Sequence, residues 1–473
     1  MQAEPLPSSI HELLMAVDLA GCTTLLHGLD LKAAEGWCAR DRVGFLSELK
    51  RRGVANLKFR QTIANAVSRN GRRREEYHAL AAEDVAAPGS GPVLQPEDPR
   101  LLFSRWNWAV RSTAISNQPG AYFKCSWRGL LDTVVLTVDS SASSQPFMNL
   151  SYAFDEQPCC VVTVPHGSRS AEVQLVPTQT CAKTEDSVSN ETDTHSIVVH
   201  ILASVQQFDR WGSDGKLPPN TLRLASVQLP YGADAQLPKA LKYSMVAFGC
   251  SITEGVCARF KPGSKASDLN SNSSTSAWHV ATAEALNAEY SSVGFGRQGW
   301  TIDGNGNVPP FTSSWRFLWA GMPRVFRSHT AEPPDFVLIN HGCNDGLNGA
   351  LPGVVSRAVV SSLRAMRTEC GPQTHIFLVV PFGGWCASSA PEGALATAYQ
   401  QYQALQPDPK LQLIDLGPGA AHNLAGFRTE RGRYVMSRES IDGVHPTAER
   451  HRELGALVAE YISRAIAFGT AAS

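Results

Sequence analysis

From Leu241 onward, apolar runs of strand length alternate with segments of helical periodicity. Buried runs that are separated by helices are typical of a parallel sheet covered by helices on both faces. The expected strands are Tyr243–Phe248, Glu289–Gly294, Asp335–Asn340, His375–Pro381 and Gln412–Leu416. The expected helices are Ala277–Asn287, Val354–Thr368, Ala394–Leu405 and Thr447–Phe468. The sequence therefore predicts an α/β, flavodoxin-like domain over residues 239–473.

A serine follows the first of these strands. The stretch reads Val246-Ala-Phe-Gly-Cys-Ser-Ile-Thr-Glu-Gly255, and the apolar run ends abruptly at Gly249. Open α/β sheets present their chemistry just past the carboxyl ends of the strands. Glycines on both sides of Ser251 allow a sharp turn and a close approach of substrate. Gly-x-Ser alone also fits an ordinary polar turn, so the assignment depends on two later stretches.

An asparagine follows the third expected strand, in the stretch Gly342-Cys-Asn-Asp-Gly346. Asn344 should share the carboxyl edge of the sheet with Ser251. Its amide can donate to a developing oxyanion, an interaction worth roughly 3 kcal/mol when such a donor is removed. An Asx-turn that only stabilises the loop is the alternative interpretation.

The third stretch, Asp442-Gly-Val-His445, lies near the C-terminus. A carboxylate three residues before a histidine can accept the Nδ1 proton of the ring, which leaves Nε2 free to act as a base toward a serine. We therefore predict Ser251 as nucleophile, His445 as general base and Asp442 as the residue that orients it. Cys250 is a weaker candidate nucleophile, since adjacent side chains diverge.

Together these stretches resemble the sequence blocks of the SGNH, or GDSL-like, hydrolases. Gly249 to Ile252 resembles the first block, Val293 to Thr301 the second, Gly342 to Asp345 the third, and Asp442 to His445 the fifth. One departure is Cys250, which stands where the family has Asp and puts the local geometry in doubt. An α/β-hydrolase would instead require Gly-x-Ser-x-Gly.

The resemblance implies a serine ester hydrolase that forms an acyl-enzyme and needs no metal or organic cofactor. It also implies an oxyanion hole that contains the N–H of Ser251 and the side chain of Asn344. The remaining donor would be the backbone N–H of Gly296 or of Arg297, depending on the alignment.

The chain preceding the α/β domain divides into three parts. Residues 1–80 show helical periodicity and resemble a SAM-like domain, through the pivot Leu49-Lys-Arg-Arg-Gly-Val54 and a following helix; this implies protein interaction or self-association. An unrelated helical bundle is the alternative. Residues 81–99 are rich in Pro, Gly and Ala and predict a linker. Residues 100–238 have period-two runs between turn residues, which predict a β-sandwich.

A sandwich directly before an SGNH block resembles the arrangement of carbohydrate esterase family two, in which a jelly-roll domain packs on the hydrolase. This implies deacetylation of a sugar or glycan. We expect an aromatic wall for a sugar ring, although these residues could also be packing residues. The expected ring-binding residues are Trp300, Trp315, Trp319 and Trp385, with Phe311 nearby. The alternatives are a lipid-type esterase, lysophospholipase or thioesterase, and a glycan- or protein-binding scaffold with a vestigial hydrolase.

Composition narrows the remaining possibilities. The formal net charge of −1 gives no reason to expect a nucleic-acid partner. No apolar run is long enough for a membrane span, and no signal peptide is visible, so a cytoplasmic location is expected. The eleven cysteines are scattered without Cys-x-x-Cys pairs, which argues against a zinc site or a disulfide framework.

Overall fold

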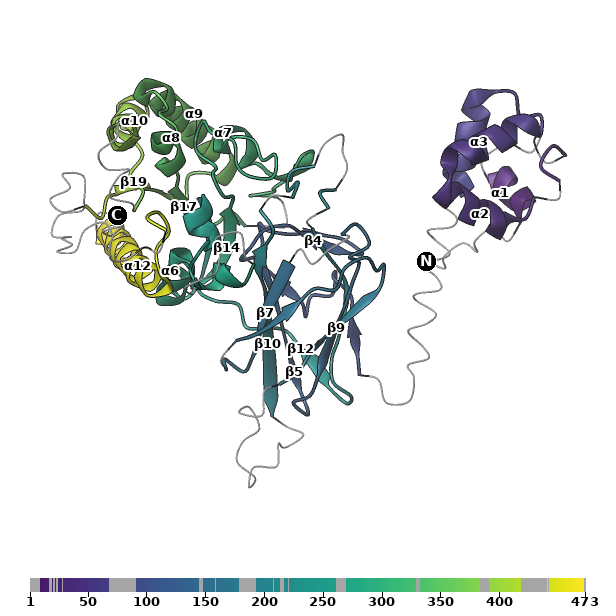
Figure 1. The fold of residues 1–473 in the computed structure, drawn as a ribbon, viewed down its shortest axis with the longest axis horizontal. Helices are drawn as coiled ribbons and strands as arrows, with labels where there is room; N and C mark the ends of the chain where they lie inside the picture. Colours follow the sequence, from purple (N-terminus) through teal and green to yellow (C-terminus); the bar gives the residue numbers. More distant parts are fainter. Residues whose placement is uncertain are drawn as a thin grey trace. The chain divides into compact units, whose positions relative to one another are not determined.

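The computed structural model has two compact units, Met1–Ser90 and Gly91–Ser473, and we describe each by itself (Figure 1). The residues that it describes are 9–16, 19, 22, 24–27, 29–67, 91–143, 148–157, 159–177, 193–206, 208–212, 217–219, 221–260, 269–328, 332–382, 391–417, 440 and 442–471.

The first unit is helical. Its helices are α1 (Ile10–Ala16), α2 (Leu31–Arg40), α3 (Arg42–Arg51) and a helix over residues 57–67. Asp30 and Asp41 cap α2 and α3 by accepting hydrogen bonds from the backbone N–H groups of Ala33 and Gly44. Apolar side chains from all four helices share one buried cluster. The SAM-like assignment of this unit remains a prediction.

The second unit begins with two antiparallel sheets. The first has the order β3-β4-β11-β6-β9, with β1 paired to β11, and the second has the order β12-β5-β10-β7-β8, with β2 paired to β5. One buried cluster takes side chains from both sheets, including Leu136 and Val173 from the first and Phe123 and Val199 from the second. The strands are β1 (Val93–Leu94), β2 (Leu102–Phe103), β3 (Ala109–Val110), β4 (Ala114–Ser116), β5 (Tyr122–Arg128), β6 (Val134–Val138), β7 (Met148–Phe154), β8 (Cys160–Thr163), β9 (Ala171–Leu175), β10 (Thr194–Ser204), β11 (Leu222–Gln228) and β12 (Asp234–Gln236).

A five-stranded parallel sheet follows, as the periodicity predicts. Its strand order is β14-β13-β17-β18-β19, which is the flavodoxin-like order 2-1-3-4-5. The strands are β13 (Tyr243–Gly249), β14 (Ala288–Gly294), β17 (Phe336–Asn340), β18 (His375–Val379) and β19 (Leu411–Ile414). The small hairpin of β15 (Phe317–Trp319) and β16 (Met322–Pro323) forms a separate sheet.

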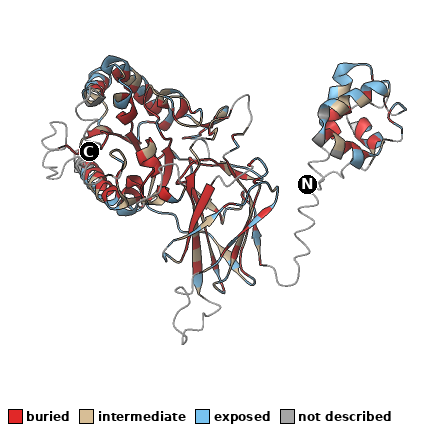
Figure 2. Cartoon of the chain, in the orientation of Figure 1, coloured by how far each residue is buried: buried red, intermediate tan, exposed pale blue. Residues whose placement is uncertain are grey.

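Helices cover both faces of the parallel sheet (Figure 1). Alternate residues of β13 show the two faces: Ala247 packs in a cluster with residues of α6 and α12, whereas Phe248 packs with residues of α9 and α10. Figure 2 shows the buried sheet between more exposed helices. The helices of this region are α5 (Ser251–Glu254), α6 (Trp278–Leu286), α7 (Phe311–Ser314), α8 (Cys343–Leu347), α9 (Pro352–Cys370), α10 (Pro391–Leu405) and α12 (Ala448–Ala471), with the 3₁₀ turns η3 (Leu269–Ser271) and η4 (Ser274–Ser276).

The antiparallel region covers the edge of the parallel sheet at β14. Asn107 donates from Nδ2 to the carbonyl of Ser292 at 2.7 Å, and its Oδ1 accepts from the N–H of Ser292 at 3.1 Å. The N–H of Trp106 donates to the hydroxyl of Ser291. The two Asn107 contacts satisfy backbone groups that an edge strand would otherwise leave open. Among the described residues, no helix is both long and apolar enough to span a membrane.

Candidate active site

Ser251 lies where the sequence places it, at the first position of α5 and just past the carboxyl end of β13. Gly249 permits this turn because a Cβ there would come within 1.9 Å of the Thr253 hydroxyl. Gly255 ends the short helix at φ 76°, a conformation that favours glycine. The tight turn leaves Ser251 partly exposed while the residues that follow it are buried.

The predicted base and its carboxylate meet the serine. Nε2 of His445 lies 2.8 Å from Oγ of Ser251, and Nδ1 of His445 lies 2.6 Å from Oδ2 of Asp442. With the ring proton on Nδ1, Nε2 can accept the proton of the hydroxyl. The three side chains, separated by almost 200 positions in sequence, therefore form a continuous hydrogen-bonded chain.

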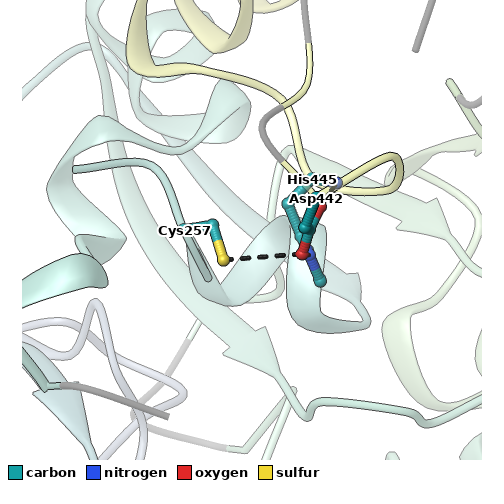
Figure 3. A group of neighbouring side chains, drawn as sticks. All are labelled: Cys257, Asp442 and His445. Atoms are coloured by element: carbon teal, nitrogen blue, oxygen red, sulfur yellow. Dashed lines mark hydrogen bonds and ion pairs between the residues drawn. The ribbon is translucent and has the colours of Figure 1, made fainter. Parts of the chain in front are cut away.

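The Asp442 carboxylate has further donors around it. Its Oδ1 accepts from the N–H of Val444 at 3.0 Å and of His445 at 2.9 Å, and its Oδ2 lies 3.6 Å from the thiol of Cys257. Figure 3 shows the Cys257 sulfur turned toward this carboxylate. Partial burial raises the pKa of Asp442, but hydrogen bonds from His445 and the backbone outweigh this and hold the pKa well below its usual range. The carboxylate is therefore ionised and able to orient the histidine.

The strand order brings together the loops that carry the predicted oxyanion donors. Because β13 lies between β14 and β17, the loops that follow these three strands meet at one edge of the sheet. Asn344 lies on α8, directly after β17, and is 8 % exposed. Its Nδ2 donates to the carbonyl of Gln298, in the loop after β14, at 3.1 Å. A primary amide carries two hydrogens, so one donor remains for a ligand.

The loop after β14 settles how the Gly296 N–H is used. This N–H donates to Oε2 of Glu254 at 2.9 Å, so it is already occupied by a carboxylate. The prediction that Gly296 supplies an oxyanion donor is therefore wrong for this geometry. Arg297 comes next, at φ 65°, and its backbone N–H has no hydrogen-bond partner among the described residues. Arg297 was the alternative that the sequence left open.

Glu254 belongs to a buried network that sequence reasoning missed. Its Oε1 accepts from Arg210 at 2.8 Å, and its Oε2 accepts from Gln206 at 2.9 Å as well as from Gly296. Arg210 and Glu254 are 0 % and 3 % exposed. Burial raises the pKa of Glu254, and the Arg210 guanidinium and the Gly296 N–H oppose that rise.

Arg210 and Gln206 come from the segment between β10 and β11, more than 40 residues before Glu254. The antiparallel region therefore supplies side chains that, through Glu254, anchor the loop after β14. The sequence signal was Glu254 itself, a carboxylate directly after an apolar strand and a serine. Its partners could not be identified without the fold.

Asp345 fixes the next part of the same loop. It accepts hydrogen bonds from the N–H groups of Trp300 and Thr301 at 2.8 and 2.9 Å, and from the Thr301 hydroxyl at 2.8 Å. Asp345 is fully buried and neighbours Asn344 on α8. Asp345, in the stretch Gly342 to Asp345, thus holds the stretch Val293 to Thr301 in place. The sequence alone predicted no role for this side chain.

The predicted aromatic wall does not form from the residues proposed for it. Trp300, Trp315 and Trp319 are 0 %, 2 % and 3 % exposed, and Trp300 and Trp315 pack in the cluster that contains Phe248 and Phe311. A ring so deeply buried has no face for a sugar. These three residues are packing residues, which was the alternative interpretation of the sequence. Trp385 lies outside the described residues.

A large cavity lies away from the serine. It has a volume of about 660 Å³ and is lined by residues at the amino ends of the parallel strands, including Tyr243, Glu289 and Asp335. The carboxyl ends of the strands, where Ser251 and Asn344 lie, form the opposite edge of the sheet. The cavity is therefore not the space in which the serine would act.

Part of the chain matches a known protein family. Residues 247–453 match the GDSL-like Lipase/Acylhydrolase family, and this match contains Ser251, Asn344, Asp442 and His445. A search of curated proteins found no match.

Solved structures extend the similarity to the antiparallel region. A family two carbohydrate esterase from Cellvibrio japonicus matches with a TM-score of 0.58 and 14 % identity, over 80 % of this chain and 98 % of that chain. One from Clostridium thermocellum, in complex with cellohexaose, has a TM-score of 0.57 and 16 % identity, over 80 % and 99 %. The acetyl xylan esterase Est2A from Butyrivibrio proteoclasticus has a TM-score of 0.59 and 14 % identity, over 80 % and 99 %. At these identities the likeness is one of fold.

Proposed function

We propose that this chain, whose residues 247–453 form a GDSL-like hydrolase domain in a fold like that of family two carbohydrate esterases, is a serine esterase. The observation that carries the proposal is the 2.8 Å contact between His445 Nε2 and Ser251 Oγ, with Asp442 on the other ring nitrogen. A serine, a base and an orienting carboxylate in this relation support nucleophilic attack on an acyl carbon.

In the proposed reaction, Ser251 Oγ attacks the ester carbonyl and its proton passes to Nε2 of His445. The oxyanion accepts hydrogen bonds from the N–H of Ser251, the N–H of Arg297 and the Asn344 amide. The alcohol then leaves with the proton from His445, and an acyl-serine remains. Water, deprotonated by His445, attacks this ester and releases the acid, which restores the serine hydroxyl.

The proposed substrate is a small acyl ester, acetyl in the first instance, of a carbohydrate or glycoside. Support comes from the similar structures, which include carbohydrate esterases and an acetyl xylan esterase. The buried tryptophans argue against using Trp300, Trp315 or Trp319 as sugar platforms. Recognition of the sugar must therefore use other groups around Ser251.

The test compares initial rates on matched p-nitrophenyl acetate, butyrate and octanoate for the full chain and for Ser251→Ala. We expect acetate to be preferred and the variant to lose activity by about 10⁴-fold or more. The exposed surface variant Ser141→Ala serves as control, because Ser141 lies in a turn of the antiparallel region. Acetylated xylo- and cello-oligosaccharides follow as second substrates.

Three outcomes would redirect the proposal. Activity that persists in Ser251→Ala would overturn the serine mechanism. Preference for octanoate would favour a lipid-type esterase or thioesterase over a deacetylase. Failure on all three esters and on acetylated oligosaccharides would favour a binding protein with a vestigial hydrolase.

We further propose that residues 1–80 mediate protein interaction or self-association. Several apolar side chains of this unit are exposed, among them Val43 (75 %), Leu57 (54 %) and Phe59 (43 %). Light scattering on the full chain and on a chain without residues 1–80 tests self-association. If both chains have the mass of a monomer, self-association through residues 1–80 is excluded.

A further inference from the structure

Cys257 is a thiol next to the triad that the proposed reaction does not use, and burial together with the Asp442 carboxylate raises its pKa to about 12. It lies at φ 60° after α5, is fully buried, and directs its sulfur at Oδ2 of Asp442 from 3.6 Å (Figure 3). The donor atoms of Cys257, Asp442 and His445 all lie within 4.8 Å of one another. Thiolate, carboxylate and imidazole are the three ligand types that zinc takes in proteins.

The distance between Cys257 and Asp442 suits a tetrahedral ion, whereas the distance between His445 and Asp442 is too short for one. With Zn–S of about 2.3 Å and Zn–O of about 2.1 Å, tetrahedral angles hold sulfur and oxygen roughly 3.6 Å apart. Cys257 Sγ and Asp442 Oδ2 are 3.6 Å apart. Nitrogen and oxygen ligands would be roughly 3.4 Å apart. Nδ1 of His445 and Oδ2 of Asp442 are only 2.6 Å apart and share a proton.

We propose that Cys257, Asp442 and His445 form an inhibitory binding site for a soft divalent cation such as Zn²⁺. The cation would enter beside Asp442, whose side chain is 30 % exposed, and take solvent as its fourth ligand. It replaces the proton on Nδ1 of His445 and the proton on the Cys257 thiol, and both protons leave to the buffer. No oxidant or reductant is required.

Inhibition follows from the ligands that the cation uses. Binding separates His445 from Asp442 and replaces the hydrogen bond that orients the ring. A metal on Nδ1 also withdraws electron density from the imidazole, so Nε2 becomes a weaker base toward Ser251. The inhibitory effect rests on the proposed esterase function, whereas binding of the cation does not.

The kinetic test titrates ZnCl₂ into the full chain during hydrolysis of p-nitrophenyl acetate, with a chelator added afterwards. We expect inhibition that the chelator reverses. Cys257→Ser keeps a hydroxyl beside Asp442 but removes the sulfur ligand. It should raise the zinc concentration for half-inhibition at least about tenfold, which corresponds to roughly 1.4 kcal/mol. Each variant is compared with its own metal-free rate.

The matched control is Cys125→Ser. Cys125 is a fully buried thiol of β5, in the core of the antiparallel region, and its replacement should leave zinc inhibition as in the unmodified chain. Inhibition that is absent, or equal in the unmodified chain and in Cys257→Ser, would overturn the proposal.

A second measurement needs no turnover. CdCl₂ is titrated into Ser251→Ala, and into Ser251→Ala with Cys257→Ser, and the ultraviolet thiolate-to-cadmium absorption is followed. We expect one saturable band that is missing when Cys257 is replaced. If the band appears but no ester is hydrolysed by the unmodified chain, the proposed function fails and the binding site stands. If hydrolysis occurs without a Cys257-dependent band, the binding site fails alone.

Discussion

The base side and the oxyanion side of the candidate site are built in opposite ways. The base side is the stretch Asp442 to His445, in which one carboxylate binds its own backbone and the histidine three residues later. The oxyanion side draws on the loop after β14, on Asn344 and on the buried Glu254–Arg210 pair. The first is local and partly exposed, and the second is long-range and buried.

This difference teaches which part of the site the fold constrains. A histidine that serves as base and then as acid must exchange protons with substrate and water, so partial exposure suits it. Donors to an oxyanion act best when they are fixed beforehand in a dry environment. In the proposed site, the antiparallel region would help to meet the second requirement, because Arg210 and Gln206 hold Glu254 behind the loop after β14.

The largest effect should come from the base side. Asp442→Asn keeps the shape of the side chain but favours the wrong histidine tautomer, so we expect kcat to fall about 10⁴-fold with little loss of thermal stability. Steady-state kinetics and thermal melting measure both quantities. Asp139→Asn, at another partly exposed carboxylate, is the control. A fall of less than tenfold would show that Asp442 does not orient His445.

Removing one donor on the oxyanion side should cost less. We expect Asn344→Ala to lower kcat by about 10²- to 10³-fold with KM nearly unchanged, because the donor acts mainly on the developing charge. Asn344→Asp, which places a carboxylate at the same point, should lose at least as much. An Asn344→Ala enzyme with unaltered kcat would remove this amide from the oxyanion hole.

The buried pair behind the loop should have a smaller effect on rate and a distinct one on stability. Arg210→Met alone leaves Glu254 buried without its cation, which costs about 3–5 kcal/mol. The double variant Arg210→Met, Glu254→Gln removes both charges, so much of the melting temperature should return. Its kcat should stay reduced, by up to about 10²-fold, because the loop is no longer held as firmly.

A second, largely buried ion pair, near the amino ends of β18 and β19, provides the control. Arg367 pairs with Asp408 at 2.7 Å and donates to the carbonyl of Thr374, just before β18. Arg367→Met with Asp408→Asn should change stability but leave kcat unaltered. If the Arg210 double variant behaves in the same way, its network is structural and does not position the oxyanion loop.

The smallest expected effect concerns the stability of the fold at acidic pH, which depends on buried histidines outside the triad. Burial lowers the pKa of His279 to about 3, and neither ring nitrogen of His279 has a hydrogen-bond partner among the described residues. Burial likewise lowers the pKa of His451 to about 3 and of His200 to about 4. An unfolded chain binds these protons near pH 6.5. The folded state therefore loses stability relative to the unfolded chain as the pH falls below about 6.5.

Each such histidine contributes up to about 1.4 kcal/mol per pH unit between the unfolded and folded pKa values. We expect His279→Leu to flatten the dependence of melting temperature on pH between about pH 6 and pH 4. Melting curves at several pH values measure the slope. An unchanged slope would mean that His279 is protonated in the folded chain as readily as in the unfolded one.

Much of the hydrolase domain could be predicted because its signals are local. The strand predicted at Tyr243–Phe248 is β13, Tyr243–Gly249, and the helix predicted at Ala277–Asn287 is α6, Trp278–Leu286. Periodicity reports such elements directly, since it records which residues are buried on one segment. The Asp442 and His445 spacing is informative for the same reason, because three residues of chain suffice to bring the two side chains together.

Only the tertiary structure decided how the distant groups combine. It assigned the Gly296 N–H to Glu254, paired Glu254 with Arg210, buried Trp300 and Trp315, and brought the Cys257 thiol to Asp442. The sequence of a loop does not show whether an aromatic side chain faces a ligand or packs in the core. Contacts between residues far apart along the chain depend on which strands become neighbours, and strand order is a property of the packed sheet rather than of any one segment.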